Sequence, residues 1–349
     1  MGGNALKGLT KRLTREDYAV CEKTIRDLFQ EKLGLPTICI PSYKEKEDFG
    51  DLDLIVNLDF LRQRQTKEEE VFDFVENFVA RHFYSRQQVV NTNILSFEYR
   101  KTPKDEMGFQ VDLIAFPAEE IKTAVAYYSY NDLGNLIGRV TESMGLKYGH
   151  DGLSFRFFLN DDYQTTIVVS RDTDEILSFL GYNPERFKKG FNNLDEIFSY
   201  VKSSPYFHKD YYLLEKRNHK SRVRDKKRKT YCEFLKNLES EPDKPKPSLP
   251  SLGDIFNKFP EFKTNHDKLL GDILVRNEIR SIFNGERVNN VTGLIHKQLG
   301  DFMKFFASSF ETPNDMLQHI KNTSNIDDDI MNAFVRFQLL TTKKSVSPS

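Results

Sequence analysis

Two carboxylates separated by one apolar residue stand at the start of a strongly apolar run. Gly50 is followed by Asp51, Leu52 and Asp53, and the apolar run 54–56 continues without a break. A β-strand directs residues i and i+2 to the same face, so we expect Asp51 and Asp53 to point the same way. Two carboxylates this close repel each other unless a cation lies between them. Mg²⁺ prefers oxygen ligands and takes one or two protein carboxylates together with substrate phosphates. The pair therefore predicts a site for a divalent metal ion.

A third carboxylate, Asp112, lies within the apolar run 109–116, which is typical of a buried strand. An acid flanked by core-like residues is costly unless it is paired or bound to a metal ion. An ordinary aspartate at a strand end or a sheet edge is the alternative. Together with Asp51 and Asp53, Asp112 predicts a carboxylate triad.

The order of these features resembles the DNA polymerase β-type nucleotidyltransferase superfamily, and within it the CCA-adding enzymes and poly(A) polymerases. The shared order is a helix, a strand that ends in a small residue, a short spacer, Gly-Asp-x-Asp and a third aspartate on a later strand. The match covers about residues 14–116. This chain has Pro41-Ser42 where the family has Gly-Ser.

The resemblance implies an α/β (α+β) nucleotidyltransferase palm followed by mainly helical C-terminal appendages. It implies a transfer of a nucleoside monophosphate from an NTP to an acceptor hydroxyl, with release of pyrophosphate and with two Mg²⁺ (or Mn²⁺) ions as cofactors. The expected acceptor is a nucleic acid, an RNA or tRNA 3′ end. The residues that match the family's catalytic, metal-binding positions are Asp51, Asp53 and Asp112. The residues that match its nucleotide-binding loop are Ser42, Lys46 and Gly50.

The composition limits the class of protein. A chain of 349 residues predicts two or three domains. The net charge is −1, so affinity for a nucleic acid must come from local patches of charge. The three cysteines are widely spaced, which favours free thiols and a cytoplasmic or other reducing intracellular compartment. No run of 18 apolar residues occurs, so we expect no membrane partner.

Changes in composition along the chain predict its domains. Four prolines between positions 242 and 250 predict a stiff, extended linker. The expected segments are a palm domain (1–125), a central α+β domain (126–240), a proline-rich linker (241–250), a helical C-terminal domain (251–340) and a disordered tail (341–349).

Local patterns predict individual elements. Thr14 with Asp17 three residues later, and Gly34 past the last apolar residue, predict a helix before the first catalytic strand. Thr66 begins a second capping pattern, and residues 127–145 predict one helix that leaves the palm. Residues 1–13, which are Gly-rich and then basic, predict either a frayed terminus or an arm that folds over the active cleft.

The strongest charge feature is the basic segment 216–229, which holds nine Lys or Arg against one Asp. Such a block favours a surface that follows a phosphate backbone. A solvated helix face or a localisation signal is the alternative. The residues that we predict to bind nucleic acid are Arg217, Lys220, Arg222, Arg224, Lys226, Lys227 and Arg228, and the resemblance implies that this nucleic acid is RNA.

Two other functions remain open. The first is a nucleotide-sugar glycosyltransferase, in which Asp-x-Asp also holds a divalent ion, although such an enzyme predicts no site for a polyanion. The second is a catalytically inactive nucleic-acid-binding scaffold, against which the presence of all three carboxylates argues.

Overall fold

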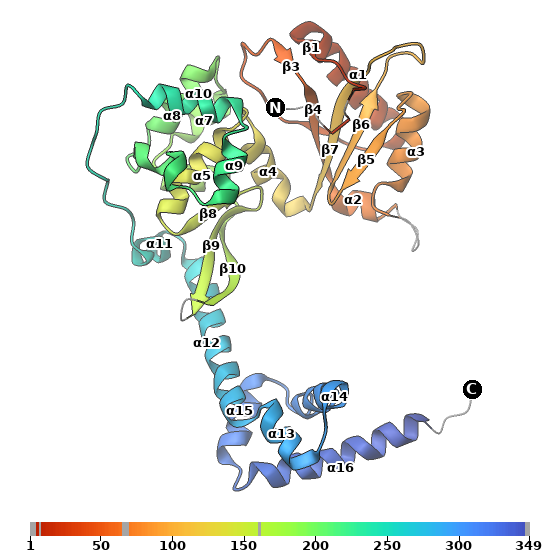
Figure 1. Ribbon diagram of the computed structural model, residues 1–349, viewed down its shortest axis with the longest axis vertical. Coiled ribbons are helices and arrows are strands. Elements are labelled where there is room, and N and C mark those ends of the chain that lie inside the picture. The colour runs from red at the N-terminus through yellow and green to blue at the C-terminus, as the bar shows by residue number, and fades with distance from the viewer. Residues whose placement is uncertain (1–4, 7, 65–69, 160–161, 346–349) are drawn as a thin grey trace. The chain divides into compact units, whose positions relative to one another are not determined.

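The computed structural model describes residues 5–6, 8–64, 70–159 and 162–345. The chain divides into two compact units, Met1–Phe262 and Lys263–Ser349 (Figure 1). The first unit contains mixed α and β structure, and the second is helical. Among the described helices, none combines the length and the apolar character that a membrane span requires.

The first unit begins with a five-stranded mixed sheet in the order β2-β4-β7-β6-β5. The central pair β4 and β7 is parallel, and the other neighbours are antiparallel. The strands of the first unit are β1 (Leu13–Thr14), β2 (Ile38–Cys39), β3 (Asp48–Phe49), β4 (Asp51–Asn57), β5 (Gln88–Asn91), β6 (Ile94–Tyr99), β7 (Phe109–Phe116), β8 (Leu146–Gly149), β9 (Gly152–Leu159) and β10 (Asp162–Ser170).

Helices cover the sheet and build the rest of the first unit. They are α1 (Arg15–Leu33), α2 (Leu58–Arg62), α3 (Asp73–His82), α4 (Ile121–Tyr128), α5 (Leu133–Ser143), α6 (Thr173–Phe179), α7 (Pro184–Lys189), α8 (Leu194–Lys202), α9 (His219–Asp225), α10 (Lys229–Leu238) and α11 (Leu252–Lys258). Three short 3-10 turns are η1 (Ala118–Glu120), η2 (Lys209–Tyr211) and η3 (Leu214–Lys216).

Helix α1 forms where the capping pattern predicts it. The Thr14 side chain accepts a hydrogen bond from the backbone N–H of Asp17, and Gly34 ends the helix in the left-handed conformation. The buried face of α1 carries Ile25 and Phe29. The start of the second predicted helix, at Thr66, lies outside the described residues, and α3 begins at Asp73.

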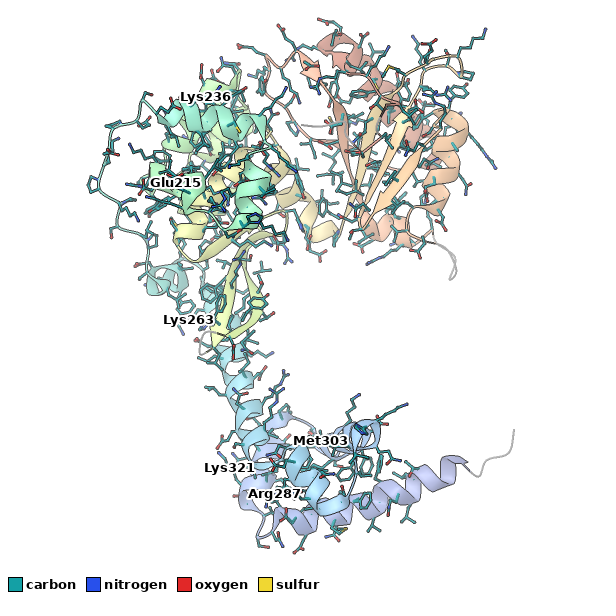
Figure 2. The ribbon with its side chains drawn as sticks, viewed as in Figure 1. Glu215, Lys236, Lys263, Arg287, Met303 and Lys321 are labelled. Atoms are coloured by element: carbon teal, nitrogen blue, oxygen red, sulfur yellow. The ribbon has the colours of Figure 1, made fainter. Side chains whose placement is uncertain are left out.

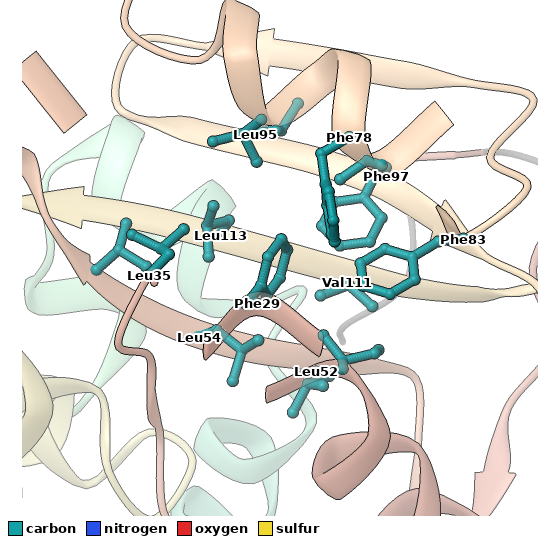
Figure 3. Close-up of a cluster of buried hydrophobic side chains, with 14 of the residues drawn as sticks. Phe29, Leu35, Leu52, Leu54, Phe78, Phe83, Leu95, Phe97, Val111 and Leu113 are labelled. Atoms are coloured by element: carbon teal, nitrogen blue, oxygen red, sulfur yellow. The ribbon is translucent and has the colours of Figure 1, made fainter. Parts of the chain in front are cut away.

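One face of the sheet packs against α1 and α3 (Figure 3). Leu52 and Leu54 of β4 and Leu113 of β7 are fully buried there, and Phe29 stacks edge-on against Phe97 and Phe83. This alternation leaves Asp51, Asp53 and Asp112 on the opposite face. On that face α4 covers Ile55 and Ile114, so the carboxylates occupy the part that α4 does not cover.

The chain leaves the palm through two helices, which corrects the expectation of a single helix over 127–145. Tyr130 and Asn131 both have left-handed φ values, of 57° and 63°, and they separate α4 from α5. Non-glycine residues adopt this conformation rarely, and it interrupts a helix. Beyond α5, strands β8, β9 and β10 form an antiparallel sheet, and helices α6 to α11 also belong to the unit.

Backbone hydrogen bonds join the loop before β4 to the α4–α5 corner and to the segment before α8. The N–H of Tyr130 donates to the carbonyl of Pro41 at 2.7 Å. The N–H groups of Lys44 and Glu45 donate to the carbonyls of Phe191 and Asn192 at 2.9 and 2.8 Å. The loop before β4 is therefore fixed to the segment that precedes α8.

The proline-rich segment packs on the first unit and does not separate the two units. His208 Nε2 donates to the Lys244 carbonyl at 2.8 Å, and Lys202 forms an ion pair with Glu241 at 2.6 Å. Further along, Phe259 contacts Phe179 with ring centroids 5.1 Å apart. The two compact units divide at Phe262 and not at residues 241–250, because side chains on both sides of the prolines are packed on the first unit.

The second unit is a helical bundle with its own hydrophobic core. Its helices are α12 (Pro260–Ile282, which starts in the first unit), α13 (Gly285–Thr292), α14 (His296–Ala307), α15 (Pro313–Asn322) and α16 (Ile326–Ser345). Arg287 and Lys321 form ion pairs with Asp327 and Glu278 (Figure 2). Helix α16 extends to Ser345, so residues 341–345 of the expected tail are helical, and the rest of that tail lies outside the described residues.

Candidate metal and nucleotide site

The parallel pairing of β4 and β7 brings the three carboxylates together. Asp53 lies directly opposite Asp112, and Asp51 lies opposite Gln110. One carboxylate oxygen from each of Asp51, Asp53 and Asp112 lies within 4.8 Å of the other two. Three oxygen donors at this spacing, all carboxylates, are the ligand type that Mg²⁺ and Mn²⁺ prefer. The residues present therefore fit a divalent ion.

The electrostatics of the cluster also favour a cation. Burial, reinforced by the charges of Asp51 and Asp112, raises the pKa of Asp53 well above its ordinary value. Burial raises the pKa of Asp112 to about 6, although hydrogen bonds from Ser96 and Gln110 oppose that shift. Ionised carboxylates therefore destabilise one another here, and a bound divalent ion removes that repulsion.

Lys46, in the loop before β4, is a cationic side chain that interacts with Asp51 and Asp53. Burial lowers the pKa of Lys46, and the charges of Asp51 and Asp53 act in the opposite direction. Its Nζ lies 4.6 Å from the centre of the Phe49 ring, and Arg15 donates to its carbonyl. Lys46 is thus held beside the carboxylates by contacts on both its backbone and its side chain.

A cavity of about 1140 Å³ opens in front of Asp51 and Asp53. Asp112 converges with them, but it does not appear among the described lining residues. The palm contributes Asp51, Asp53, Gly50 and Lys46 to its lining, together with Tyr43. Ser42 is half-buried, and among the described lining residues it does not appear. Of the three residues predicted to bind the nucleotide, Lys46 and Gly50 therefore line the cavity beside the carboxylates, and Ser42 does not.

The opposite wall of the cavity is basic and comes from the segment 216–229. Four of the seven residues predicted to bind nucleic acid line the cavity: Lys220, Arg224, Lys227 and Arg228. The other three, which are Arg217, Arg222 and Lys226, do not line it among the described residues. The predicted nucleic-acid-binding residues thus form two groups, one that lines the cavity opposite Asp51 and Asp53 and one that lies outside its lining.

Internal partners hold several of these arginines in place. Arg217 forms an ion pair with Glu142 at 2.6 Å, and Arg228 forms one with Asp132. Arg224 donates to Asn135 Oδ1 at 3.2 Å. Among the described residues, Lys220 and Lys227 have no carboxylate within ion-pair distance, so their charge is available to a bound anion.

A buried ion pair fixes the helix that carries this wall. Arg139 of α5 and Asp225 of α9 are 3% and 0% exposed in their side chains and lie 2.9 Å apart. Tyr212 and Tyr231, which flank the basic segment, are fully buried and therefore belong to the core. Asn135 is also buried, whereas Asn131 lines the cavity.

Arg12 lines the cavity, and it belongs to the segment 1–13, for which an arm over the cleft was one of the two expectations. Sequence patterns did not single out two other residues of the site: Gln110 donates to both oxygens of Asp112, and Glu233 lines the cavity. Of these two, only Gln110 carried a usable signal, because it stands two residues before Asp112 on the same strand and therefore shares its face.

Two other acidic residues of the palm, Glu98 and Asp105, have partners of their own. Glu98 is fully buried, and Arg86 donates to it at 2.5 and 3.1 Å. Asp105 accepts from the backbone and the side chain of Thr102 at 2.9 and 3.0 Å. Among the described residues, Asp51, Asp53 and Asp112 are the group whose ligand atoms converge.

Comparison with known proteins gives a distant likeness. No family model matches the sequence, and no curated protein matches it. Among solved structures, the chain is similar to Leishmania infantum polymerase beta, in the crystal structure of a ternary gap complex, with 16% sequence identity and a TM-score of 0.35. The likeness covers 43% of this chain and 53% of that one, so it spans about half the length of the polymerase.

Proposed function

We propose that this chain is a metal-dependent nucleotidyltransferase. It would transfer a nucleoside monophosphate from an NTP to an acceptor hydroxyl and release pyrophosphate. The observation that carries the proposal is the cavity that has Asp51 and Asp53 on one wall, with Asp112 converging on them, and five Lys or Arg side chains of the segment 216–229 on the other wall. The carboxylates suit divalent ions, and the cations suit the phosphates of the substrate.

The proposed roles follow from position. Asp51, Asp53 and Asp112 would hold two Mg²⁺ (or Mn²⁺) ions. When bound, these ions neutralise charge on the entering and leaving oxygens of an in-line displacement. Asp112 would lie nearest the acceptor hydroxyl and accept its proton. Phosphoryl transfer requires mainly positioning and electrostatic stabilisation from the protein, which this arrangement of charged groups supplies.

The substrate phosphates would be bound by the basic wall. Lys220 and Lys227 would contact them directly, and Arg224 and Arg228 would add charge from positions fixed by Asn135 and Asp132. Lys46 would contact the phosphates from the palm side. These assignments replace the expectation that the whole segment 216–229 binds the acceptor.

The acceptor we propose is the 3′ end of an RNA or a tRNA. The support is the resemblance to enzymes that act on RNA 3′ ends, and the location of Arg222 and Lys226 outside the cavity lining, in the same segment as the residues that would bind phosphate. A neutral sugar acceptor would need no further cations, so the basic residues outside the cavity favour a polyanion.

The test is transfer of labelled nucleotide. The purified protein is incubated with each NTP labelled at the α-phosphate, with Mg²⁺ or Mn²⁺, and in turn with RNA, tRNA and DNA. We expect extension of a 3′ end and release of pyrophosphate. Release of a nucleoside diphosphate from a nucleotide sugar would instead identify a glycosyltransferase.

Matched variants assign the chemistry to the triad. Asp51→Asn and Asp53→Asn should each abolish transfer, because each removes charge from the metal site and keeps the volume of the side chain. Asp162→Asn, an exposed acid on β10, is the control and should retain full activity. Near-normal turnover in both triad variants would refute the proposed function.

A further inference from the structure

The side chain of Gln110 bridges the N-terminal arm and the third carboxylate. Gln110 is 2% exposed. Its Nε2 donates to Oδ1 and Oδ2 of Asp112 at 3.0 and 2.9 Å, and its Oε1 accepts from the backbone N–H of Ala5 at 3.0 Å. Both ends of one buried amide are therefore occupied.

The two partners of Gln110 require the same orientation of its amide. The Ala5 N–H can only donate, so it selects the amide oxygen. The ionised Asp112 carboxylate can only accept, so it selects the amide nitrogen. Removing the Ala5 donor would leave the amide oxygen buried without this partner, and rotation of the amide would then turn its oxygen towards the carboxylate.

The arm that supplies Ala5 is packed on the palm. Leu6 is fully buried. The Gly108 N–H donates to the Leu9 carbonyl at 2.8 Å, and the Lys11 N–H donates to the Gly108 carbonyl at 2.9 Å. A Cβ at Gly108 would lie 2.5 Å from the Glu98 side chain, so only glycine fits this contact. In its described residues the arm is therefore not a frayed terminus.

We propose that the N-terminal arm is a positioning element for the metal site and that Gln110 is the positioning residue through which it acts. The arm fixes the Gln110 amide, and the amide fixes the plane of the Asp112 carboxylate opposite Asp53. A carboxylate otherwise rotates about two side-chain bonds, and a rotated Asp112 would no longer converge with the other two. The inference rests on the proposed function in one respect, which is that Asp112 binds a metal ion.

The first test measures Mn²⁺ binding by electron paramagnetic resonance on the full chain without nucleotide. Gln110→Met keeps the length of the side chain and removes both donated hydrogen bonds. Loss of a hydrogen-bond partner behind a metal ligand costs about 10- to 100-fold in metal affinity. We expect a loss of that size, and a fall in kcat with little change in KM for the NTP. Unchanged Mn²⁺ affinity in Gln110→Met would overturn the inference.

The second test asks whether the arm acts through Gln110. Ala5→Pro removes the donating N–H and should weaken Mn²⁺ binding in the same direction. The double variant should bind Mn²⁺ no more weakly than Gln110→Met alone, because both changes break one chain of contacts. Additive losses, or an unchanged affinity in Ala5→Pro, would overturn it. If Gln110→Met does not fold, the comparison of Ala5→Pro with the wild type decides.

A control separates positioning from general loss of stability. Leu61→Ala removes a fully buried side chain of α2 and should lower the melting temperature without changing Mn²⁺ affinity. A matching loss of Mn²⁺ affinity in Leu61→Ala would overturn the inference. If the wild type binds Mn²⁺ but transfers no nucleotide, the proposed function fails, and the inference is still decided by the Mn²⁺ affinities.

Discussion

Replacing Asp112 by Asn is expected to stabilise the metal-free protein at neutral pH. Burial and the Asp51 charge raise the pKa of Asp112 from its ordinary 3.8 to about 6. At about 1.4 kcal/mol per pH unit, this difference corresponds to roughly 3 kcal/mol, an upper bound on what the ionised carboxylate costs the folded state. Asn resembles the neutral acid and avoids that cost, so we expect a gain of about 1–3 kcal/mol.

The sign of the pH dependence follows from linkage. The folded-state pKa of Asp112 lies above the unfolded-state value, so the folded state binds its proton more tightly. The stability that this carboxyl contributes is fully present below about pH 4, and it is lost as the pH rises through about 6. The free energy of unfolding of Asp112→Asn should therefore match that of the wild type near pH 4 and exceed it at pH 8.

The assay is urea unfolding in EDTA at a series of pH values between 4 and 8. Asp105→Asn is the matched control, because Thr102 hydrogen bonds lower the pKa of Asp105, and its loss should not stabilise the protein. In saturating Mn²⁺ the wild type should have the higher free energy of unfolding, since the ion stabilises only a folded protein that binds it and Asp112→Asn lacks one of the carboxylate ligands. A difference between Asp112→Asn and the wild type that is the same at pH 4 and pH 8 would refute the reasoning.

Three further predictions follow from the fold and the cavity. The double variant Lys220→Ala/Lys227→Ala should raise KM for the NTP. The double variant Arg222→Ala/Lys226→Ala should instead weaken RNA binding and flatten the slope of log affinity against log salt by about 0.7 per lost contact with single-stranded RNA. Steady-state kinetics and salt titrations distinguish the two double variants, and equal effects on KM would contradict the division of the basic segment. A chain that ends at residue 262 should fold and bind NTP, as measured by calorimetry, but lose affinity for a long acceptor; loss of NTP binding would show that the second unit belongs to the site. Phe29→Ala should lower the free energy of unfolding by about 3–5 kcal/mol in urea titrations, because it leaves a cavity between α1 and the sheet. A loss below about 1 kcal/mol would contradict that packing.

The placement of the carboxylates was predictable because it depends on local periodicity. Asp51 and Asp53 share a strand face whatever the rest of the chain does, and the apolar neighbours of Asp112 marked its strand. Thr14 and Gly34 marked the ends of α1 because capping depends on residues that are adjacent in sequence. The structure contains each of these elements at the expected positions.

The features that the sequence did not reveal depend on which segments meet in space. Nothing near Lys220 or Lys227 indicates that they face Asp51 across a cavity. Nothing near Ala5 indicates that its N–H meets Gln110. The proline-rich segment 241–250 was misleading for a related reason, because proline restricts the backbone but does not determine whether the neighbouring side chains pack on a domain.

The backbone hydrogen bonds from Tyr130, Lys44 and Glu45 have a consequence for folding cooperativity. They join the loop before β4 to the α4–α5 corner and to the segment before α8, so this loop cannot move away from either one without breaking them. Opening of this loop therefore also releases the segment before α8 from its contacts with the palm. In hydrogen-exchange experiments, a metal ion bound only by palm residues should slow exchange in α8 (Leu194–Lys202) as well as in β4.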